Sequence, residues 1–130
     1  MKPIQQDRRE NVEEKRAIEL LDTIIDLKDL YGDIINHLSY GKVNKMKIAL
    51  FKAKVLELYV FLRPKIVLKK EYSDLVSFLD YFIFNPKEWK SRFSMKDALE
   101  SFFLLYEFCE RERLFDVKSY SDILYQQANY

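Results

Sequence analysis

The sequence contains one histidine and one cysteine, and these are the two side chains best suited to chemistry. Asp33 precedes His37 by four residues, so in a helix its carboxylate lies one turn away and would orient or charge the imidazole. Such pairs are common on the surfaces of helices. Cys109 ends a largely apolar run that begins at Leu104, and we expect a core position for it, because a catalytic thiol needs a nearby base.

Known catalytic and metal-binding motifs are missing from the sequence. A carboxylate-bridged dimetal bundle requires Glu three residues before His, and Ile34 occupies that position. No Gly-x-Ser-x-Gly motif occurs, and one cysteine by itself forms neither an internal disulfide nor a cysteine-based zinc site. We therefore predict a protein that is not an enzyme and uses no metal or cofactor.

Five acidic residues form a stripe along the first predicted helix. At 100° per residue, they fall within about 80° of one another. A cation site is not expected from this stripe alone, because Mg²⁺ and Ca²⁺ prefer oxygen ligands that converge from a loop or from several elements. The acidic stripe consists of Glu19, Asp22, Asp26, Asp29 and Asp33.

The net charge of +1 conceals a basic block over residues 42–70, where nine Lys or Arg residues accompany a single acidic residue, Glu57. Acidic residues outnumber basic ones on both sides of this block. Its positive charge would attract nucleic-acid phosphates and displace their counterions. The predicted nucleic-acid contacts are Lys42, Lys45, Lys47, Lys52, Lys54, Arg63, Lys65, Lys69 and Lys70.

A second interpretation of the basic block is neutralisation by the acidic stripe. In an antiparallel hairpin that turns near Gly41, Asp29 and Asp33 lie at about the height of Lys52 and of residues 45–48. We favour a solvated face with some cross-helix pairing, because exposed charge is the default on a helix and lysine side chains extend beside apolar helices.

Aromatic residues gather in the second half of the chain. Tyr81 and Phe84 fall outside the main apolar arc of the third predicted helix, and Trp89 and Phe93 follow in the connecting loop. The favoured interpretation is that these four rings cover the core beneath a loop. The alternative is an exposed protein interface formed by Tyr81, Phe84, Trp89 and Phe93, although large exposed apolar patches are uncommon on monomers.

The elements that must position these residues are helices. The chain of 130 residues has only two glycines and three prolines, too few for the turns of a β architecture. Apolar residues recur at helical spacing over residues 8–39 and 42–62, and the second helix should end near Arg63 because Pro64 follows. A short turn at Gly41 makes these two helices an antiparallel hairpin.

Two further helices and a short tail complete the prediction. The third helix starts near Ser73 and stops at Asn85 and Pro86, whereas Ser94 and Asp97 form a capping box that opens a fourth helix reaching about Leu114. Residues 119–122 repeat that signal for a short fifth helix. We predict an all-α fold in a single domain over residues 1–130, a compact bundle of four main helices with a short C-terminal fifth, and residues 1–7 as a flexible N-terminus.

These features favour a non-catalytic interaction protein. The second and fourth helices are apolar on nearly all sides, which is typical of central helices or of helices covered by another chain. Partners are expected to be another protein or copies of this chain; the alternative is a nucleic-acid-binding accessory subunit using residues 42–70. No apolar run approaches the roughly 20 residues that span a bilayer, so we expect no membrane partner and a cytoplasmic location.

In architecture alone, such a basic, glycine-poor bundle resembles the small subunits of CRISPR effector complexes and small proteins of archaeal viruses. That resemblance implies a viral or mobile-element protein and carries over no site residue.

Overall fold

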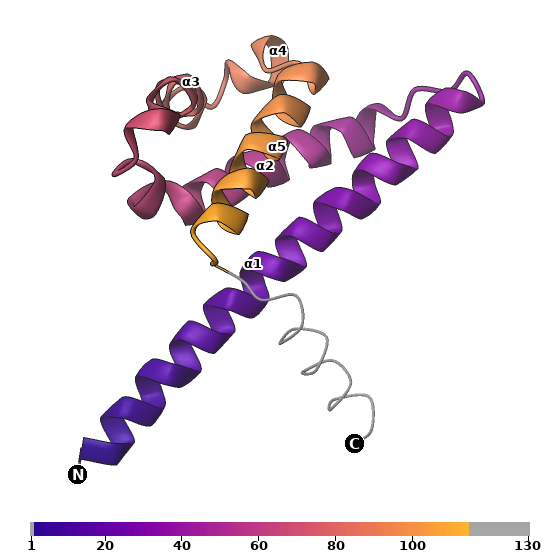
Figure 1. The fold of residues 1–130 in the computed structure, drawn as a ribbon. Coiled ribbons are helices and arrows are strands. Elements are labelled where there is room, and N and C mark those ends of the chain that lie inside the picture. The colour runs from indigo at the N-terminus through magenta and orange to yellow at the C-terminus, as the bar shows by residue number, and fades with distance from the viewer. Residues whose placement is uncertain (1, 115–130) are drawn as a thin grey trace, which may run out of the picture.

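Every regular element in the described part of the chain is a helix. The computed structural model describes residues 2–114, with side chains from Lys15 onward. The predicted all-α bundle of four main helices is confirmed, whereas the fifth helix predicted over residues 119–122 lies outside the described residues. The elements are α1 (Lys2–Ser39), α2 (Lys45–Ile66), one turn of 3₁₀-helix (Lys70–Tyr72), α3 (Ser73–Phe84), α4 (Trp89–Arg92) and α5 (Met95–Arg111) (Figure 1).

α1 is longer than the sequence pattern indicates. It spans 38 residues, or about 57 Å at 1.5 Å per residue, and begins at Lys2 instead of near Arg8. The flexible N-terminus over residues 1–7 stays a prediction. None of the described helices is long and apolar enough to cross a membrane.

The turn between α1 and α2 is fixed by hydrogen bonds on both sides. The Gly41 N–H donates to the carbonyl of Leu38 and the Lys42 N–H to that of His37, both at 2.9 Å. This Schellman arrangement requires the φ of +72° that glycine adopts without strain. On the other side, the Asn44 side chain accepts the N–H of Lys47 at 3.1 Å and caps α2. The predicted antiparallel hairpin is thus confirmed, with α2 beginning at Lys45 instead of Lys42.

The prediction that Pro64 ends the second helix is wrong, because α2 continues one turn further, to Ile66. The Val67 N–H still donates to the carbonyl of Arg63 at 3.1 Å, so the last turn closes after the proline. A proline inside a helix removes one backbone bond and costs about 3 kcal/mol. Burial offsets that cost here, because Ile66 is fully buried one turn beyond Leu62.

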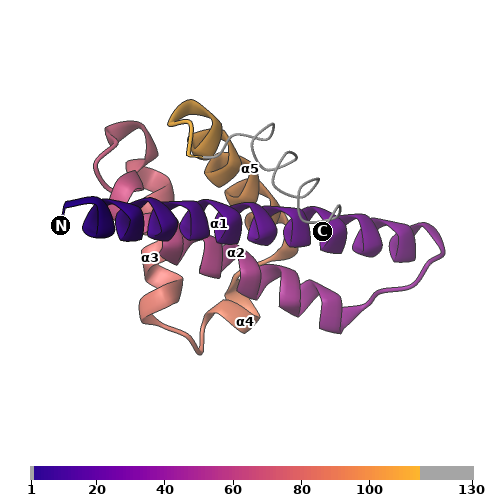
Figure 2. The same ribbon diagram turned by 90° about the horizontal axis from the view of Figure 1, so that it is seen from below.

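α2 is the central helix of the bundle. It contacts α1, α3 and α5, and in the view from below α1 lies in front of it (Figure 2). The Phe51 ring joins three helices, with its centroid 6.4 Å from the Tyr31 ring of α1 and 6.1 Å from the Phe102 ring of α5. The buried residues of α2 are Phe51, Val55, Leu56, Leu58, Tyr59, Leu62 and Ile66.

The second half of the fold follows the predicted boundaries closely. α3 occupies the predicted range, and the capping box is present, with the Asp97 N–H donating to Ser94 Oγ at 3.0 Å and the Ser94 N–H donating to Asp97 Oδ2 at 3.3 Å. α5 ends at Arg111, three residues before the predicted end at Leu114. The single turn α4, which carries Trp89, was expected to be loop.

Candidate functional site

Two lysines of the predicted basic block pair with the acidic stripe of α1. Lys47 Nζ lies 2.9 Å from Asp33 Oδ2, and Lys54 Nζ lies 3.5 Å from Asp26 Oδ2. The predicted pairing across the hairpin is therefore found, although Asp26 takes the place expected for Asp29. Each pair contributes little to stability, about 0.2–1 kcal/mol, because the carboxylates are exposed to water. Their main effect is to neutralise the middle of the basic block.

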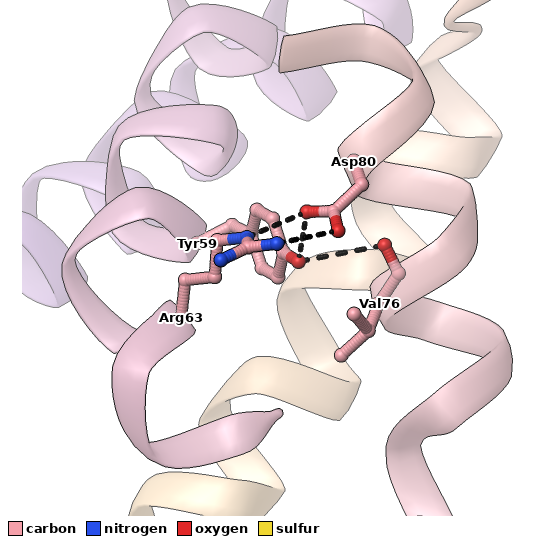
Figure 3. A network of polar contacts seen from close by, with 4 residues as sticks. All are labelled: Tyr59, Arg63, Val76 and Asp80. Carbon is pink, nitrogen blue, oxygen red and sulfur yellow. Dashed lines mark hydrogen bonds and ion pairs between the residues drawn. The ribbon is translucent and has the colours of Figure 1, made fainter. Parts of the chain in front are cut away.

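Arg63, another predicted nucleic-acid contact, is held by a carboxylate of α3 (Figure 3). Its Nε and Nη2 each donate to one oxygen of Asp80 at 2.9 Å. The buried Tyr59 donates to Asp80 Oδ1 at 2.5 Å, and its hydroxyl also lies 3.4 Å from the carbonyl of Val76. Such fork-shaped pairs are stronger than single charged hydrogen bonds. The network fastens α3 to α2 and gives Arg63 a structural role.

The pKa values within this network follow from its hydrogen bonds and its burial. The Arg63 donors hold the pKa of Asp80 below its usual range, so this carboxylate is ionised at neutral pH. Burial, and then the hydrogen bond to Asp80, raises the pKa of Tyr59. The hydroxyl therefore keeps its proton and remains a donor.

The remaining predicted nucleic-acid contacts do not form one surface. Lys69 pairs with Glu112 at 3.1 Å. Five lysines of the basic block have no ion-pair partner within the described range. Two of them lie at each end of α2, which is about 33 Å long, and one lies between the two ends. The basic block is therefore divided into two small separate groups. The five are Lys42, Lys45, Lys52, Lys65 and Lys70.

His37 does not meet the carboxylate that was expected to orient it. Its Nδ1 lies 2.7 Å from the backbone carbonyl of Asp33, so this nitrogen is the donor, while the Asp33 carboxylate binds Lys47. The ring is therefore held against a backbone carbonyl within the C-terminal part of α1.

The thiol of Cys109 lies in the core, as predicted. Burial raises its pKa to about 12, so the thiol is protonated at neutral pH. Among residues 15–114, no group of three or more His, Cys, Asp or Glu side chains is arranged to hold a metal ion.

The four predicted interface aromatics have different environments. Phe93 is fully buried against Phe82, with ring centroids 4.9 Å apart, so it belongs to the core and presents no contact surface in this structure. Trp89 packs partly buried against the core. Tyr81 and Phe84 are exposed, Phe84 with 71% of its surface accessible. Phe93 and Trp89 thus cover the core, as the favoured interpretation has it, whereas Tyr81 and Phe84 are exposed and available for contacts.

The turn of the α1–α2 hairpin projects away from α3 and α5 (Figures 1 and 2), and exposed apolar residues lie in and beside it. Tyr40, Val43 and Met46 expose 76%, 61% and 82% of their surfaces. Lys42 and Lys45 lie between them and are also exposed. We call these five residues the hairpin end. Sequence reasoning missed it, although apolar residues alternating with lysines through a turn are unusual in a polar loop.

A groove runs between α1 and α2 further along the same hairpin, with a volume of about 460 Å³. Its base is formed by the buried Leu20 and Leu58, and Val60 and Phe61 are exposed on the α2 side. Four acidic side chains and one lysine complete it. We call it the acidic groove; these charged residues are Glu19, Asp22, Asp26, Glu57 and Lys54.

Comparison with models of known protein families, with curated proteins and with solved structures finds no match to this chain.

Proposed function

We propose that this is a non-catalytic interaction protein that works through contacts between its helical hairpin and another protein chain. The observation that supports the proposal is the hairpin end, where three large apolar side chains are exposed together. Burying such side chains against a partner is favourable by roughly 25 cal/mol per Å² of apolar surface. Clustered exposure of this kind is typical of contact sites.

The rigidity of the turn adds to this argument. Gly41 closes the end of α1 and Asn44 caps α2, so the backbone between them is already ordered. A partner that binds a preformed surface has a smaller entropic cost to overcome than one that must order a loop. The capped turn thus makes the exposed side chains a shaped surface.

Nucleic-acid binding through residues 42–70 is the alternative proposal, and the charge distribution gives it less support. Four of its nine cations are paired with Asp26, Asp33, Asp80 and Glu112. Affinity for DNA or RNA that falls steeply with salt would favour this alternative.

Tyr81 and Phe84 are proposed as a second, smaller protein contact.

The proposed function is tested with a variant in which Tyr40, Val43 and Met46 are each replaced by serine. Tagged protein is used for capture from its native cell extract, and purified protein is measured by light scattering. We expect the triple variant to lose association by about tenfold or more, which corresponds to at least about 1.4 kcal/mol.

Leu68→Ser is the matched control, because Leu68 is 78% exposed just after the opposite end of α2. This variant should associate like the natural chain. A natural chain that is strictly monomeric and captures no protein would contradict the proposed function. So would a partner that binds the triple variant as tightly as the natural chain.

A further inference from the structure

We propose that the partner of the hairpin end is the acidic groove of a second copy of this chain. This inference rests on the proposed function and names its partner. The two surfaces lie on the same hairpin but on different parts of it, so each copy carries both halves of the contact.

Charge is the first observation that carries the inference. The hairpin end has two lysines, Lys42 and Lys45, and no acidic residue between positions 38 and 46. Neither lysine has an ion-pair partner in the described range. The acidic groove has the opposite balance, four carboxylates against Lys54, and Glu19 and Glu57 are likewise without an ion-pair partner among residues 15–114. Opposite charges that face each other steer association and fix its register.

Apolar character is the second observation, because it is shared by both surfaces. The groove exposes Val60 and Phe61 above a base of leucines, and the hairpin end presents Tyr40 and Met46. Aromatic and methionine side chains inserted between apolar walls, with charges at the rim, are the usual anatomy of a protein interface. A nucleic acid would be repelled by the carboxylates of the groove because its phosphates are negative, and a simple cation has no apolar surface to offer.

The spacing of the groove residues gives the contact a regular shape. On α1 the lining positions include 19, 22, 23 and 26, and on α2 they include 54, 57, 58 and 61. Each set repeats at intervals of three and four residues and so occupies one face of its helix. The two faces form opposite walls of the groove, and in the proposed contact the projecting turn of the second copy enters between them.

The geometry of such a contact is head to tail. Because one copy contributes its hairpin end and the next contributes its groove, the interface is heterologous, and repetition yields a closed ring or an open filament. This differs from a two-fold dimer, in which the same surface of each copy meets itself.

The test uses two charge-reversal variants of the full chain. The first carries Lys42→Glu and Lys45→Glu at the hairpin end, and the second carries Glu19→Lys and Glu57→Lys in the groove. Light scattering at low salt should give the natural chain a mass that rises with concentration well above 15.8 kDa, whereas each variant alone should stay at that monomer mass. An equimolar mixture of the variants should assemble again. The acidic end of the first variant then meets the basic groove of the second, and the unchanged end of the second meets the unchanged groove of the first.

Two controls keep the result specific. Lys65→Glu with Lys70→Glu makes the same change of charge at the other end of α2 and should assemble like the natural chain. High salt should weaken the natural assembly, because the screening length falls to about 3 Å at 1 M. Recovery in the mixture also separates a lost contact from a lost fold, since two unfolded variants would not restore assembly.

A natural chain that stays monomeric at low salt and high concentration would overturn the inference. Unchanged assembly of either variant, or no recovery in the mixture, would overturn it as well. If such a monomer captures another protein in a manner that depends on Tyr40, Val43 and Met46, the second-copy inference fails while the proposed function stands.

Discussion

Arg63 shows how a single neighbouring carboxylate determines what a cation does. In the sequence it is one of nine positive charges in a basic block, but in the fold Asp80 takes up its fork of donors. The same carboxylate accepts the hydroxyl of Tyr59, which is otherwise buried. One acidic side chain on α3 thus accepts from two side chains of α2. Its loss would leave Arg63 without this acceptor and Tyr59 with only the longer contact to the carbonyl of Val76.

Asp80→Asn should lower the free energy of unfolding by about 1–2 kcal/mol, less than for a fully buried pair because Arg63 is partly exposed. The amide keeps the size of the side chain but removes the charge that both donors use. Urea unfolding followed by circular dichroism measures the change. Asp29→Asn, an exposed acidic residue in the middle of α1, should change stability by less than about 0.5 kcal/mol.

The stabilisation that this network gives to the fold should depend on pH. The folded pKa of Asp80 is lowered, so its contribution is fully present above its usual value of 3.8 and is lost as the pH falls through the lower folded value. The difference in stability between the natural chain and Asp80→Asn should therefore shrink below about pH 4. A difference that stays constant down to pH 2 would show that the ion pair does not stabilise the fold.

Single residues were predictable where the controlling contacts are local. The burial of Cys109 and the capping box of Ser94 and Asp97 follow from neighbours within four positions, and the structure has both. The partner of Arg63 lies 17 positions away, and no short pattern connects the two. For the same reason, the favoured interpretation placed Phe93 over the core but did not identify Phe82 as its neighbour.

At the scale of elements, the two glycines have opposite roles. Gly41 has a φ of +72° and ends α1, whereas Gly32 lies inside α1, which continues through it without interruption. A Cβ atom built on either glycine would meet nothing within 4 Å. Backbone conformation, and not space, therefore decides what a side chain does at each position.

Gly32→Ala should stabilise the protein by about 0.5–1 kcal/mol, because alanine loses less conformational entropy in a helix. Gly41→Ala should destabilise it by about 1–2 kcal/mol, because an L-residue is strained at positive φ. Thermal unfolding of the two variants side by side measures both effects. Equal shifts in the same direction would contradict the assigned backbone conformations.

Element boundaries were predictable at the ends where a cap or a turn residue sets them. Ser94, Gly41 and Asn85 mark such ends, and the structure places them as expected. Pro64 gave a false stop, because its local preference was outweighed by the burial of Ile66, which depends on the rest of the core. The start of α1 at Lys2 was not predicted, because no apolar pattern marks the first residues of the chain.

At the scale of the whole molecule, the core depends on rings that join several helices. Phe51→Ala should lower the free energy of unfolding by about 3–5 kcal/mol, because Phe51 is fully buried between Tyr31 and Phe102. The total free energy of unfolding of such a domain is only about 5–15 kcal/mol. Chemical unfolding should therefore begin at much lower denaturant concentration.

Phe103→Ala is the control for that experiment, since Phe103 neighbours Phe102 on α5 but is exposed. It should change the unfolding free energy by less than about 1 kcal/mol. A similar loss in both variants would mean that the core is not centred on Phe51.

The distribution of charge along the chain was visible in the sequence, but the ion pairs that form in the fold were not. The basic block and the acidic stripe can be counted along the chain, and the hairpin explains why they meet. Which lysines pair depends on the positions of the side chains, 2.9 Å between Lys47 and Asp33 and 3.5 Å between Lys54 and Asp26, and composition cannot give these. The two surfaces used in the proposals likewise exist only after the chain has turned at Gly41.

The central position of α2 has a consequence for how the protein is made. Ribosomes release α1 and α2 before α5, so the hairpin can close while the rest of the chain is still being synthesised. During that interval Phe51 has its α1 neighbour Tyr31 but lacks Phe102. Until α5 is made, the nascent chain therefore leaves an apolar face of α2 uncovered. The time needed to translate residues 67–111 sets how long that face stays open.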